Sequence, residues 1–446
     1  MALTSCAGIQ STPHIVVFLT DDLGSKDTTV YGSQDVRTPN IERLAAMGTT
    51  FDQAFVASPA CAPSRAALLT GLMPARNGAE ANHTYPREGV GYLTVTLKRL
   101  GYEIAAFGKV AHGHAKPEYV WDSYSRPRVG LAENVEEYFG ERESSSPLCL
   151  LVGDRRPHVP WTTENIYDPD QAGLPPNFID TPETREHRAR YFSDITGLDE
   201  EFGKVMDLAR ENLGENIIYV FTSDHGGQWP FGKWNLYDSG IRVPLIMAWE
   251  GRIASGERTD AMVSWIDILP TLIDLAGGTV PEGIDGRSFS GVLRGVEDSH
   301  REAIFTTHSG DGVFNVYPIR SIRTKQYKYI LNLLPDHIHT NHSDILRRDG
   351  AGAFWNSWDE AADKDPEAAA IVERYFVRPP EELFDLRADE LEQNNLAEHP
   401  DYVGLAGELR ARLENWMEEQ GDERTVFNEP YPASGPRPDA ATVGRE

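Results

Sequence analysis

Short apolar runs alternate with amphipathic stretches through the N-terminal two thirds of the chain. The runs are rich in β-branched residues and bounded by polar turns, which predicts buried strands at residues 14–20, 102–107, 147–152, 217–223 and 243–249. Start and stop signals, with Pro39 in a first turn and Gly48 at the end, predict a helix at residues 38–48, and further helices are expected at 64–71 and 94–101. Apolar side chains at three- and four-residue spacing predict a long helix at residues 188–212. Strands that alternate with helices predict an α/β fold, with a large, mostly parallel sheet flanked by helices.

The pattern changes after residue 298. Three alternating segments at residues 303–307, 316–323 and 327–331 predict antiparallel strands, and residues 402–418 predict a helix. Residues 113–128 and 335–365 are expected to be long loops, and the proline-rich tail from Asn428 is expected to be irregular. We therefore predict an N-terminal α/β domain over residues 1–298. A smaller C-terminal subdomain would span residues 299–446 and contain the antiparallel strands, the helix and the tail.

Composition and charge exclude several classes of protein. Hydrophobic residues make up 40% of the 446 residues, as in ordinary globular proteins. Acidic residues outnumber basic ones by 69 to 42, giving a net charge of −27 without any basic stripe, so we expect no nucleic-acid partner. No apolar run approaches the roughly 20 residues that cross a bilayer, so we expect no transmembrane segment.

The cysteines and the N-terminus bear on location. Cys6, Cys61 and Cys149 are too few for a disulfide framework. No apolar signal-peptide region is visible, but Leu3-Thr-Ser-Cys6 resembles the end of a bacterial lipoprotein signal. On this basis we expect a bacterial periplasmic or cell-surface protein, with Cys6 as a candidate site of lipid attachment.

Polar side chains follow four of the predicted strands. Ligands of open α/β sheets bind at the carboxyl ends of the strands, so residues at these four ends are expected to meet. A single ending of this kind could be ordinary turn chemistry, whereas four together indicate a site. The residues of interest are Asp21, Asp22, Lys109, His112, Arg155, Arg156, His158, Asp224 and His225.

Three of these residues are carboxylates that would repel one another without a cation. Asp21, Asp22 and Asp224 offer hard oxygen ligands, and His225 adds an imidazole. An oxygen-rich set suits calcium or magnesium, and the imidazole leaves manganese or zinc open.

Cys61 is expected near a helix N-terminus, because Pro63 suits a first turn. Arg65 would lie one turn further on, beside the thiol. Two interpretations remain open from the residues alone. Cys61 is either a small buried apolar residue or a nucleophile activated by the helix end and the cation.

Cys61-Ala-Pro-Ser-Arg65, followed by Leu69-Thr-Gly71, resembles the Cys-x-Pro-x-Arg signature of the type I sulfatase family. The resemblance covers nearly the whole chain. It continues in family order with Asp21-Asp22, Thr38-Pro-Asn-Ile, Gly108-Lys109, Pro157-His158, Thr222-Ser-Asp-His-Gly226 and Glu382-Leu-Phe-Asp385. It implies an alkaline-phosphatase-like sulfatase fold and a sulfuric ester hydrolase. It also implies that a maturation enzyme converts Cys61 to formylglycine (3-oxoalanine).

The resemblance also implies a role for each site residue. Residue 61 would be the nucleophile, and the metal, Ca²⁺ with Mg²⁺ or Mn²⁺ as alternatives, would be held by Asp21, Asp22, residue 61, Asp224 and His225. Arg65, Lys109 and Lys233 would neutralise the sulfuryl oxygens. His158 would protonate the leaving alcohol. His112, with His114 as the fallback, would take a proton from the nucleophile.

Two subgroups of the family are similar to this chain. Gly108-Lys109-Val-Ala-His112 and Arg156-Pro-His158 resemble iduronate sulfatase, whereas Gly232-Lys233-x-Asn235-Leu-Tyr237 and Tyr317-Pro-x-Arg320 resemble heparan N-sulfatase (sulfamidase). Sulfamidase carries acids where Arg156 and Gly312 stand here, which argues against N-sulfoglucosamine. The predicted substrate-binding residues are His83, Arg155, Arg156, Trp161 and Arg320.

We therefore predict a sulfatase acting on a sulfated saccharide, such as a glycosaminoglycan or another sulfated polysaccharide fragment. The alternatives are an N-sulfoglucosamine sulfohydrolase and a phosphonate or phosphate ester hydrolase of the same superfamily. A glycan-binding pseudoenzyme would have lost site residues, and none is missing from the sequence.

Overall fold

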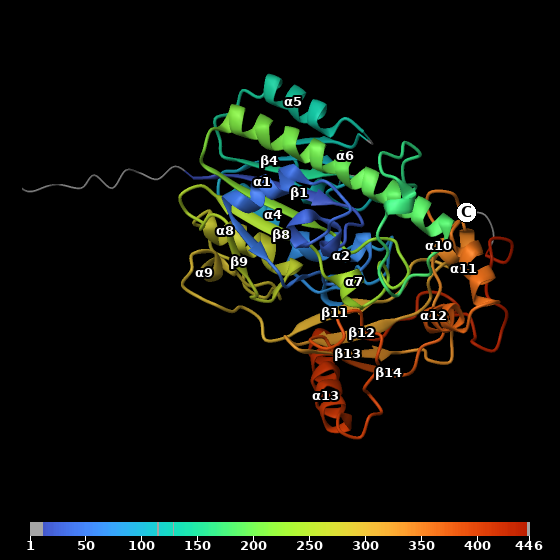
Figure 1. Cartoon of the computed structure of the whole chain (residues 1–446). Coiled ribbons are helices and arrows are strands. Elements are labelled where there is room, and N and C mark those ends of the chain that lie inside the picture. Colours follow the sequence, from blue (N-terminus) through green and yellow to red (C-terminus); the bar gives the residue numbers. More distant parts are fainter. Residues whose placement is uncertain (1–11, 114–115, 128, 444–446) are drawn as a thin grey trace, which may run out of the picture.

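The computed structural model describes residues 12–113, 116–127 and 129–443, and its centre is an eight-stranded sheet (Figure 1). The strand order is β5-β4-β6-β1-β7-β8-β2-β9. The strands are β1 His14–Thr20, β2 Thr49–Phe51, β4 Glu103–Gly108, β5 Ser123–Ser125, β6 Leu148–Gly153, β7 Ile217–Ser223, β8 Leu245–Trp249 and β9 Glu257–Thr259. Neighbours from β5 to β7 are parallel, whereas β8 runs antiparallel to β7 and β2. The prediction of a mostly parallel sheet is confirmed.

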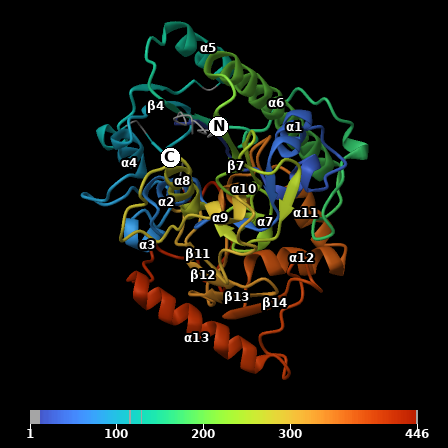
Figure 2. The same ribbon diagram turned by 90° about the vertical axis from the view of Figure 1, so that its left-hand side faces the viewer.

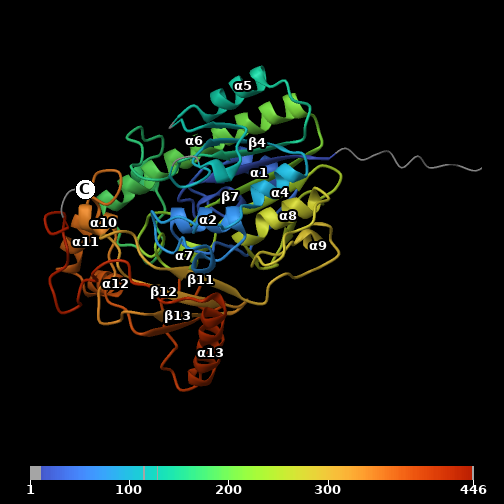
Figure 3. The same cartoon turned by 180° about the vertical axis from the view of Figure 1, so that it is seen from behind.

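Helices cover both faces of this sheet, as Figures 1 and 3 show. Helices α5 and α6 lie over one face, and α2, α4 and α8 lie over the other. Strands β6 and β7 are buried along their whole length, which explains their unbroken apolar sequences. The bounds of the helices are α1 Pro39–Met47, α2 Cys61–Thr70, α4 Leu93–Arg99, α5 Leu131–Glu141, α6 Pro182–Leu213 and α8 Ile268–Leu275.

A four-stranded antiparallel sheet follows in the C-terminal part. Its order is β11-β12-β13-β14, with bounds Ile304–His308, Ile319–Arg323, Tyr327–Asn332 and Glu381–Asp385. Helix α13, Val403–Gln420, packs against it through a small apolar core that includes Ile322, Leu383 and Leu413 (Figure 2). Other side chains of the sheet, including Ile319 and Ile330, join the main core. The boundary near residue 298 stays a prediction.

Several elements differ from the prediction. The expected loop at 335–365 contains α10 His342–Leu346 and α11 Trp355–Ala362, and α12 Pro366–Phe376 follows. The buried tryptophans of α11, Trp355 and Trp358, pack into the main core, and no local sequence pattern predicts this contact. Helix α6 begins at Pro182, six residues before the predicted start at residue 188, because Thr181 caps it by accepting a hydrogen bond from the amide of Thr184. The strand expected at 316–323 begins at Ile319, directly after Pro318.

The remaining elements are short. They are β3 Ala54–Phe55, β10 Val263–Ser264, α3 Pro74–Asn77, α7 Asp238–Ile241, α9 Ser290–Leu293 and the 3₁₀ turns Ser25–Asp27, Thr29–Tyr31, Pro117–Tyr119, Pro169–Gln171 and Trp265–Asp267. Among the described residues, no helix combines the length and apolar character needed to cross a membrane. The predicted lipid attachment site, Cys6, lies outside the described residues.

Candidate active site

The four strand ends predicted to carry the chemistry lie side by side. Strands β4, β6, β1 and β7 are consecutive neighbours in the sheet and run parallel, so their carboxyl ends share one edge. Asp21 and Asp22 follow β1, and Asp224 and His225 follow β7. The sheet therefore brings together residues that lie about 200 positions apart in the chain, as in the 3.2 Å hydrogen bond from the Asp22 amide to Asp224 Oδ1.

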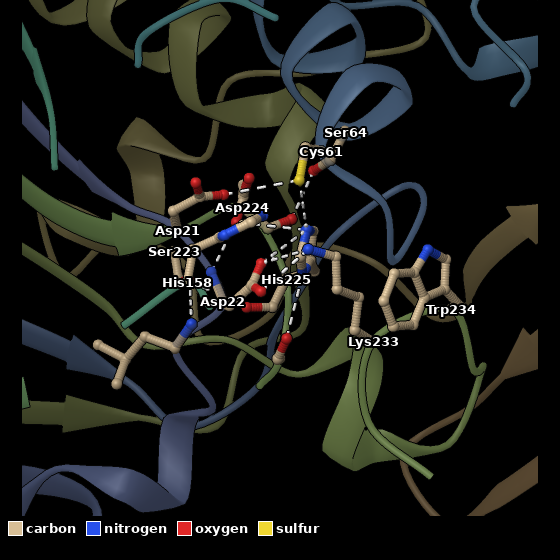
Figure 4. A network of polar contacts seen from close by, with 12 residues as sticks. Asp21, Asp22, Cys61, Ser64, His158, Ser223, Asp224, His225, Lys233 and Trp234 are labelled. Carbon is tan, nitrogen blue, oxygen red and sulfur yellow. Dashed lines mark hydrogen bonds and ion pairs between the residues drawn. The ribbon is translucent and has the colours of Figure 1, made fainter. Parts of the chain in front are cut away.

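A buried group of potential metal ligands occupies this edge (Figure 4). Donor atoms of Asp21, Asp22, Cys61 and His225 all lie within 4.8 Å of one another, and all four side chains are buried. Asp224, the fifth predicted ligand, lies beside this group, with Oδ1 3.6 Å from His225 Nε2. These donors could hold a metal ion, and the two carboxylates supply the hard oxygen ligands that divalent cations such as calcium prefer.

Two buried lysines compensate the buried acids. Lys109 Nζ lies 2.8 and 2.5 Å from the carboxylate oxygens of Asp21. Lys233 Nζ lies 2.8 and 2.9 Å from those of Asp22. Although burial opposes it, Lys109 and other nearby cations hold the pKa of the Asp21 carboxyl well below its usual range. The predicted sulfuryl-binding lysines therefore lie within the site itself.

Cys61 is the first residue of α2, as the sequence predicted for a helix N-terminus. Its Sγ lies 3.3 Å from His225 Nε2 and 3.6 Å from Asp21 Oδ1. Burial opposes ionisation, but Lys109 and Lys233 hold the pKa of the Cys61 thiol well below its usual value. The interpretation of Cys61 as an inert apolar residue is therefore the less favoured of the two.

The first turn of α2 is tied to the sheet edge. Arg65 is completely buried, and its Nε lies 2.8 Å from Asp224 Oδ2. The Ser64 hydroxyl donates a 2.7 Å hydrogen bond to the Asp224 carbonyl. These contacts hold the helix end, and with it Cys61, against the ends of β1 and β7.

The two predicted proton-transfer histidines are in different environments. Nδ1 of His158 donates a 2.6 Å hydrogen bond to the Val159 carbonyl, which leaves Nε2 for proton exchange. Nε2 of His112 lies 3.0 Å from Nδ1 of His83, and burial lowers the pKa of His112 to about 4. The fallback residue, His114, lies outside the described residues.

Two of the five predicted substrate-binding residues lie in the interior, which corrects the prediction. Trp161 is 2% exposed, and its ring stacks on Trp229 with centroids 4.4 Å apart, so it cannot stack on a sugar. Arg320 is 1% exposed and pairs with Asp422, so it holds the C-terminal subdomain together. Trp229 and Asp422, which contact Trp161 and Arg320, lie far from them in the sequence.

The other three predicted substrate-binding residues are at least partly accessible. His83 is exposed and Arg155 is partly exposed. Arg156 is also partly exposed, but its guanidinium lies 2.6 Å from the buried Asp154 carboxylate. Because Asp154 offsets its charge, Arg156 offers a substrate hydrogen bonds more than net charge.

The sequence analysis missed a fourth buried carboxylate near the site. Asp311 accepts hydrogen bonds from Asn82 Nδ2 at 2.9 Å and from Trp234 Nε1 at 2.7 Å. Asn82 in turn accepts a 3.1 Å hydrogen bond from the amide of Ala62, next to Cys61. Asn82-His83 was a weak signal for this cluster, whereas Asp311 sits in a turn without any pattern.

Comparison with known families agrees with this site. The sequence model described as Sulfatase matches residues 13–278. The model described as N-sulphoglucosamine sulphohydrolase, C-terminal, matches residues 225–339.

Curated relatives match over most of the chain. An ulvan-active sulfatase of Formosa agariphila is 31% identical over 445 residues, covering 94% of this chain and 83% of the relative. The N-sulphoglucosamine sulphohydrolase of Homo sapiens is 25% identical over 472 residues, covering 92% and 91%.

Solved structures share the fold at low sequence identity. An enzyme solved with its substrate D-glucosamine-2-N,6-O-disulfate has a TM-score of 0.72 at 18% identity, covering 94% of this chain and all of the other. A phosphonate monoester hydrolase from Silicibacter pomeroyi has a TM-score of 0.69 at 18% identity, covering 92% and 96%. These matches show an alkaline-phosphatase-like fold. Together with the family match and the 31% identical relative, they establish that the chain belongs to the type I sulfatase family and is a sulfuric ester hydrolase.

Proposed function

We propose that this sulfatase removes sulfate from a sulfated carbohydrate, with formylglycine at position 61 as the nucleophile and calcium as the metal. One observation carries the proposal: Cys61, at the N-terminus of α2, lies among buried Asp21, Asp22 and His225 with Lys109 and Lys233 beside them. This combination provides a nucleophile, a cation site and positive charge for an anionic substrate at one point.

The donor set fits a divalent cation. Asp21 and Asp22 are both fully buried, and two buried carboxylates at one point favour a bound cation. Asp21, Asp22, residue 61 and His225 would hold it, with Asp224 adjacent. When bound, the ion would polarise a sulfate oxygen and lower the pKa of an attacking hydroxyl. Calcium suits the oxygen-rich set, with magnesium or manganese as alternatives.

Residue 61 stands where the family signature places its modified cysteine. A formylglycine-generating maturation enzyme is therefore the expected partner of the nascent chain. Addition of water to the formylglycine aldehyde would give two hydroxyls on one carbon, one to attack sulfur and one whose deprotonation would expel sulfate and regenerate the aldehyde. An unmodified thiol could accept a sulfuryl group but lacks the second hydroxyl, so turnover would stop.

The protein's own residues supply charge and protons. Arg65, Lys109 and Lys233 would stabilise negative charge on the sulfuryl oxygens, as cationic clamps do in phosphoryl transfer. Nε2 of His158 would protonate the leaving alcohol, because Nδ1 is held by the Val159 carbonyl. His112, which burial keeps neutral at pH 7, would accept a proton from the nucleophile.

The substrate would be an O-sulfated sugar bound near His83, Arg155 and Arg156. The 31% identical relative is an ulvan-active sulfatase, which supports a sulfated polysaccharide fragment. A second candidate is N-sulfoglucosamine, because the C-terminal family match at residues 225–339 carries that enzyme's name. Arg156 and Gly312, which stand where sulfamidase carries acids, favour the first. Such polymers lie outside the cytoplasm, which fits the proposed periplasmic or cell-surface location.

Sulfate release from a panel of saccharides tests the proposal. The panel contains N-sulfated and 6-O-sulfated glucosamine, 2-O-sulfated uronate, and sulfated galactose and rhamnose, each with calcium. We expect release from an O-sulfated sugar, whereas release from N-sulfoglucosamine alone would favour the second candidate. A matched phosphonate ester, at equal concentration, should react more slowly. Faster phosphonate hydrolysis would overturn the sulfatase proposal.

A further inference from the structure

Asp311, a buried carboxylate of the C-terminal part, joins several parts of the active site. It lies in the turn between β11 and β12, and its side chain is 2% exposed. Oδ2 accepts hydrogen bonds from Asn82 and from Trp234, which directly follows Lys233. Oδ1 lies 3.4 Å from Nε2 of His83. One carboxylate thus contacts the segment after the nucleophile helix and the segment that carries Lys233.

The same turn also holds the backbone at His83. The amide of Asn82 donates a 2.9 Å hydrogen bond to the Gly310 carbonyl. His83 has a φ of 63°, a left-handed conformation that residues other than glycine rarely adopt. Contacts on both the backbone and the side chain therefore fix His83, although 63% of its side chain is exposed. Residues held in such sparsely populated backbone conformations cluster at functional sites.

The ring of His83 in turn contacts the ring of His112. Nδ1 of His83 lies 3.0 Å from Nε2 of His112, and the two rings meet edge to face with centroids 4.8 Å apart. Nδ1 of His112 is buried and has no hydrogen-bond partner among the described residues. A chain of contacts therefore runs from Asp311 through His83 to His112, and it ends at Nδ1 of His112, which has no hydrogen-bond partner among the described residues.

The order of donors along this chain of contacts follows from the carboxylate at its start. Nε2 of His83 lies 3.4 Å from both Asp311 Oδ1 and Asn82 Nδ2, and the ionised carboxylate, which only accepts hydrogen bonds, favours the tautomer of neutral His83 with its proton on Nε2. Nδ1 of His83 then accepts from Nε2–H of His112, and the lone pair of His112 is left on Nδ1. A histidine in this tautomer is prepared to accept a proton at Nδ1.

We propose that Asp311 is a positioning residue of the active site, which orients His83 and through it fixes the ring and tautomer of His112. The proposal rests on the proposed function only in the role given to His112. It makes the C-terminal subdomain part of the site, because Asp311, the carboxylate that pairs with His83, lies in that subdomain. It also gives His83 a role beyond contact with substrate.

The kinetics of Asp311→Asn test this arrangement. The substitution keeps the shape and one acceptor oxygen for Asn82 and Trp234. We expect kcat to fall about 10- to 100-fold, as for other residues that orient a catalytic histidine, with KM within about twofold. In a His83→Ala background, Asp311→Asn should cause no further loss of kcat. A rise in KM alone, or an undiminished loss in the His83→Ala background, would overturn the proposal.

The matched control is Asp267→Asn. Asp267 is also fully buried, and its Oδ2 lies 3.2 Å from a histidine ring nitrogen, Nε2 of His300, but the hydrogen-bond partners of its carboxylate, which are Ser264, Arg287, His300 and Arg301, are not residues of the site. The Asp267→Asn substitution should lower the melting temperature and leave kcat unchanged. An equal loss of kcat in this variant would show that Asp311 acts only through stability.

A readout without turnover separates this proposal from the proposed function. In protein labelled with ¹⁵N-histidine, we expect His112, assigned with His112→Gln, to have an unprotonated Nδ1 and a protonated Nε2. Asp311→Asn should change this protonation pattern. If Asp311→Asn does not fold, His83→Gln replaces it and should change the pattern in the same way. An unchanged spectrum would overturn the proposed role of Asp311. A changed spectrum in a protein that is inactive on every sulfate ester would support the role of Asp311 and contradict the proposed function.

Discussion

Arg65 Nε lies 2.8 Å from Asp224 Oδ2, and neither side chain is exposed to solvent. The pair connects the first turn of α2 to the end of β7. Arg65 also lies 3.5 Å from Asp21. The arginine of the Cys-x-Pro-x-Arg signature therefore holds the first turn of α2, where Cys61 lies, against the buried carboxylates of Asp21 and Asp224.

Loss of this arginine should destabilise the fold. Arg65→Met leaves Asp224 and Asp21 with less compensating charge in the interior, and breaking a buried pair in this way costs about 3–5 kcal/mol. Urea unfolding measures the change. Arg410→Met is the control, because its pair with Glu381 is 45% and 30% exposed and should contribute less than about 1 kcal/mol. Equal destabilisation of the two variants would contradict the structural role of Arg65.

Removal of the metal should lower both activity and stability. A chelator should abolish sulfate release, and added calcium should restore it. Calcium at about 100 times its Kd should stabilise the protein by about 2.7 kcal/mol, because it binds only the folded state. Thermal unfolding with and without calcium measures this shift. Asp22→Asn should lose the shift and Asp267→Asn should keep it. A chelated enzyme with full activity would refute the proposed metal site.

His158→Ala should slow the reaction according to the leaving group. A general acid contributes about 10²- to 10⁴-fold when the leaving alcohol is poor. We expect a loss of that size with a sugar sulfate and a much smaller loss with an aryl sulfate, whose phenolate leaves without protonation. Initial rates with both substrates measure the difference. The exposed His399, changed to Ala, should affect neither rate. Equal losses on the two substrates would assign His158 to binding instead of proton donation.

The contribution of Asp344 to stability should decrease as pH rises from about 4 to about 7. Burial raises the pKa of this carboxyl from 3.8 to about 7. In this range the folded protein keeps a proton that the unfolded chain has released, so the contribution of Asp344 to the free energy of unfolding decreases with pH. Urea unfolding at pH 5 and pH 8 measures the decrease. Asp344→Asn should show a smaller decrease, because it keeps acceptors for Asn341 and Tyr375 without ionising. An identical pH dependence of the two proteins would contradict this assignment.

Local sequence patterns were sufficient for the sheet edge and for much of the site. The buried strands His14–Thr20 and Ile217–Ser223 have unbroken apolar sequences, so the polar residues after them marked the edge correctly. Pro63 indicated correctly that Cys61 lies at a helix N-terminus, although the helix was expected from residue 64 and begins at Cys61. These features depend on residues that are close in sequence.

Features set by distant contacts could not be predicted in the same way. Trp161 and Arg320 had suitable chemistry for the site mouth, but Trp229 and Asp422 bury them. Helix α11 forms where its tryptophans can pack into the main core. Asp311 lies 228 residues from His83 in the chain, and only the folded structure shows that the two meet.

Sulfate release by wild type and by Cys61→Ala, with calcium and an O-sulfated saccharide that the wild type hydrolyses, tests the central claim most directly. Cys149→Ala is the control, because this thiol is buried in β6 and lies outside the proposed catalytic machinery. We predict that Cys61→Ala stays folded and releases no sulfate above background, while Cys149→Ala remains active. Turnover by a folded Cys61→Ala protein would contradict the assignment of residue 61 as the nucleophile.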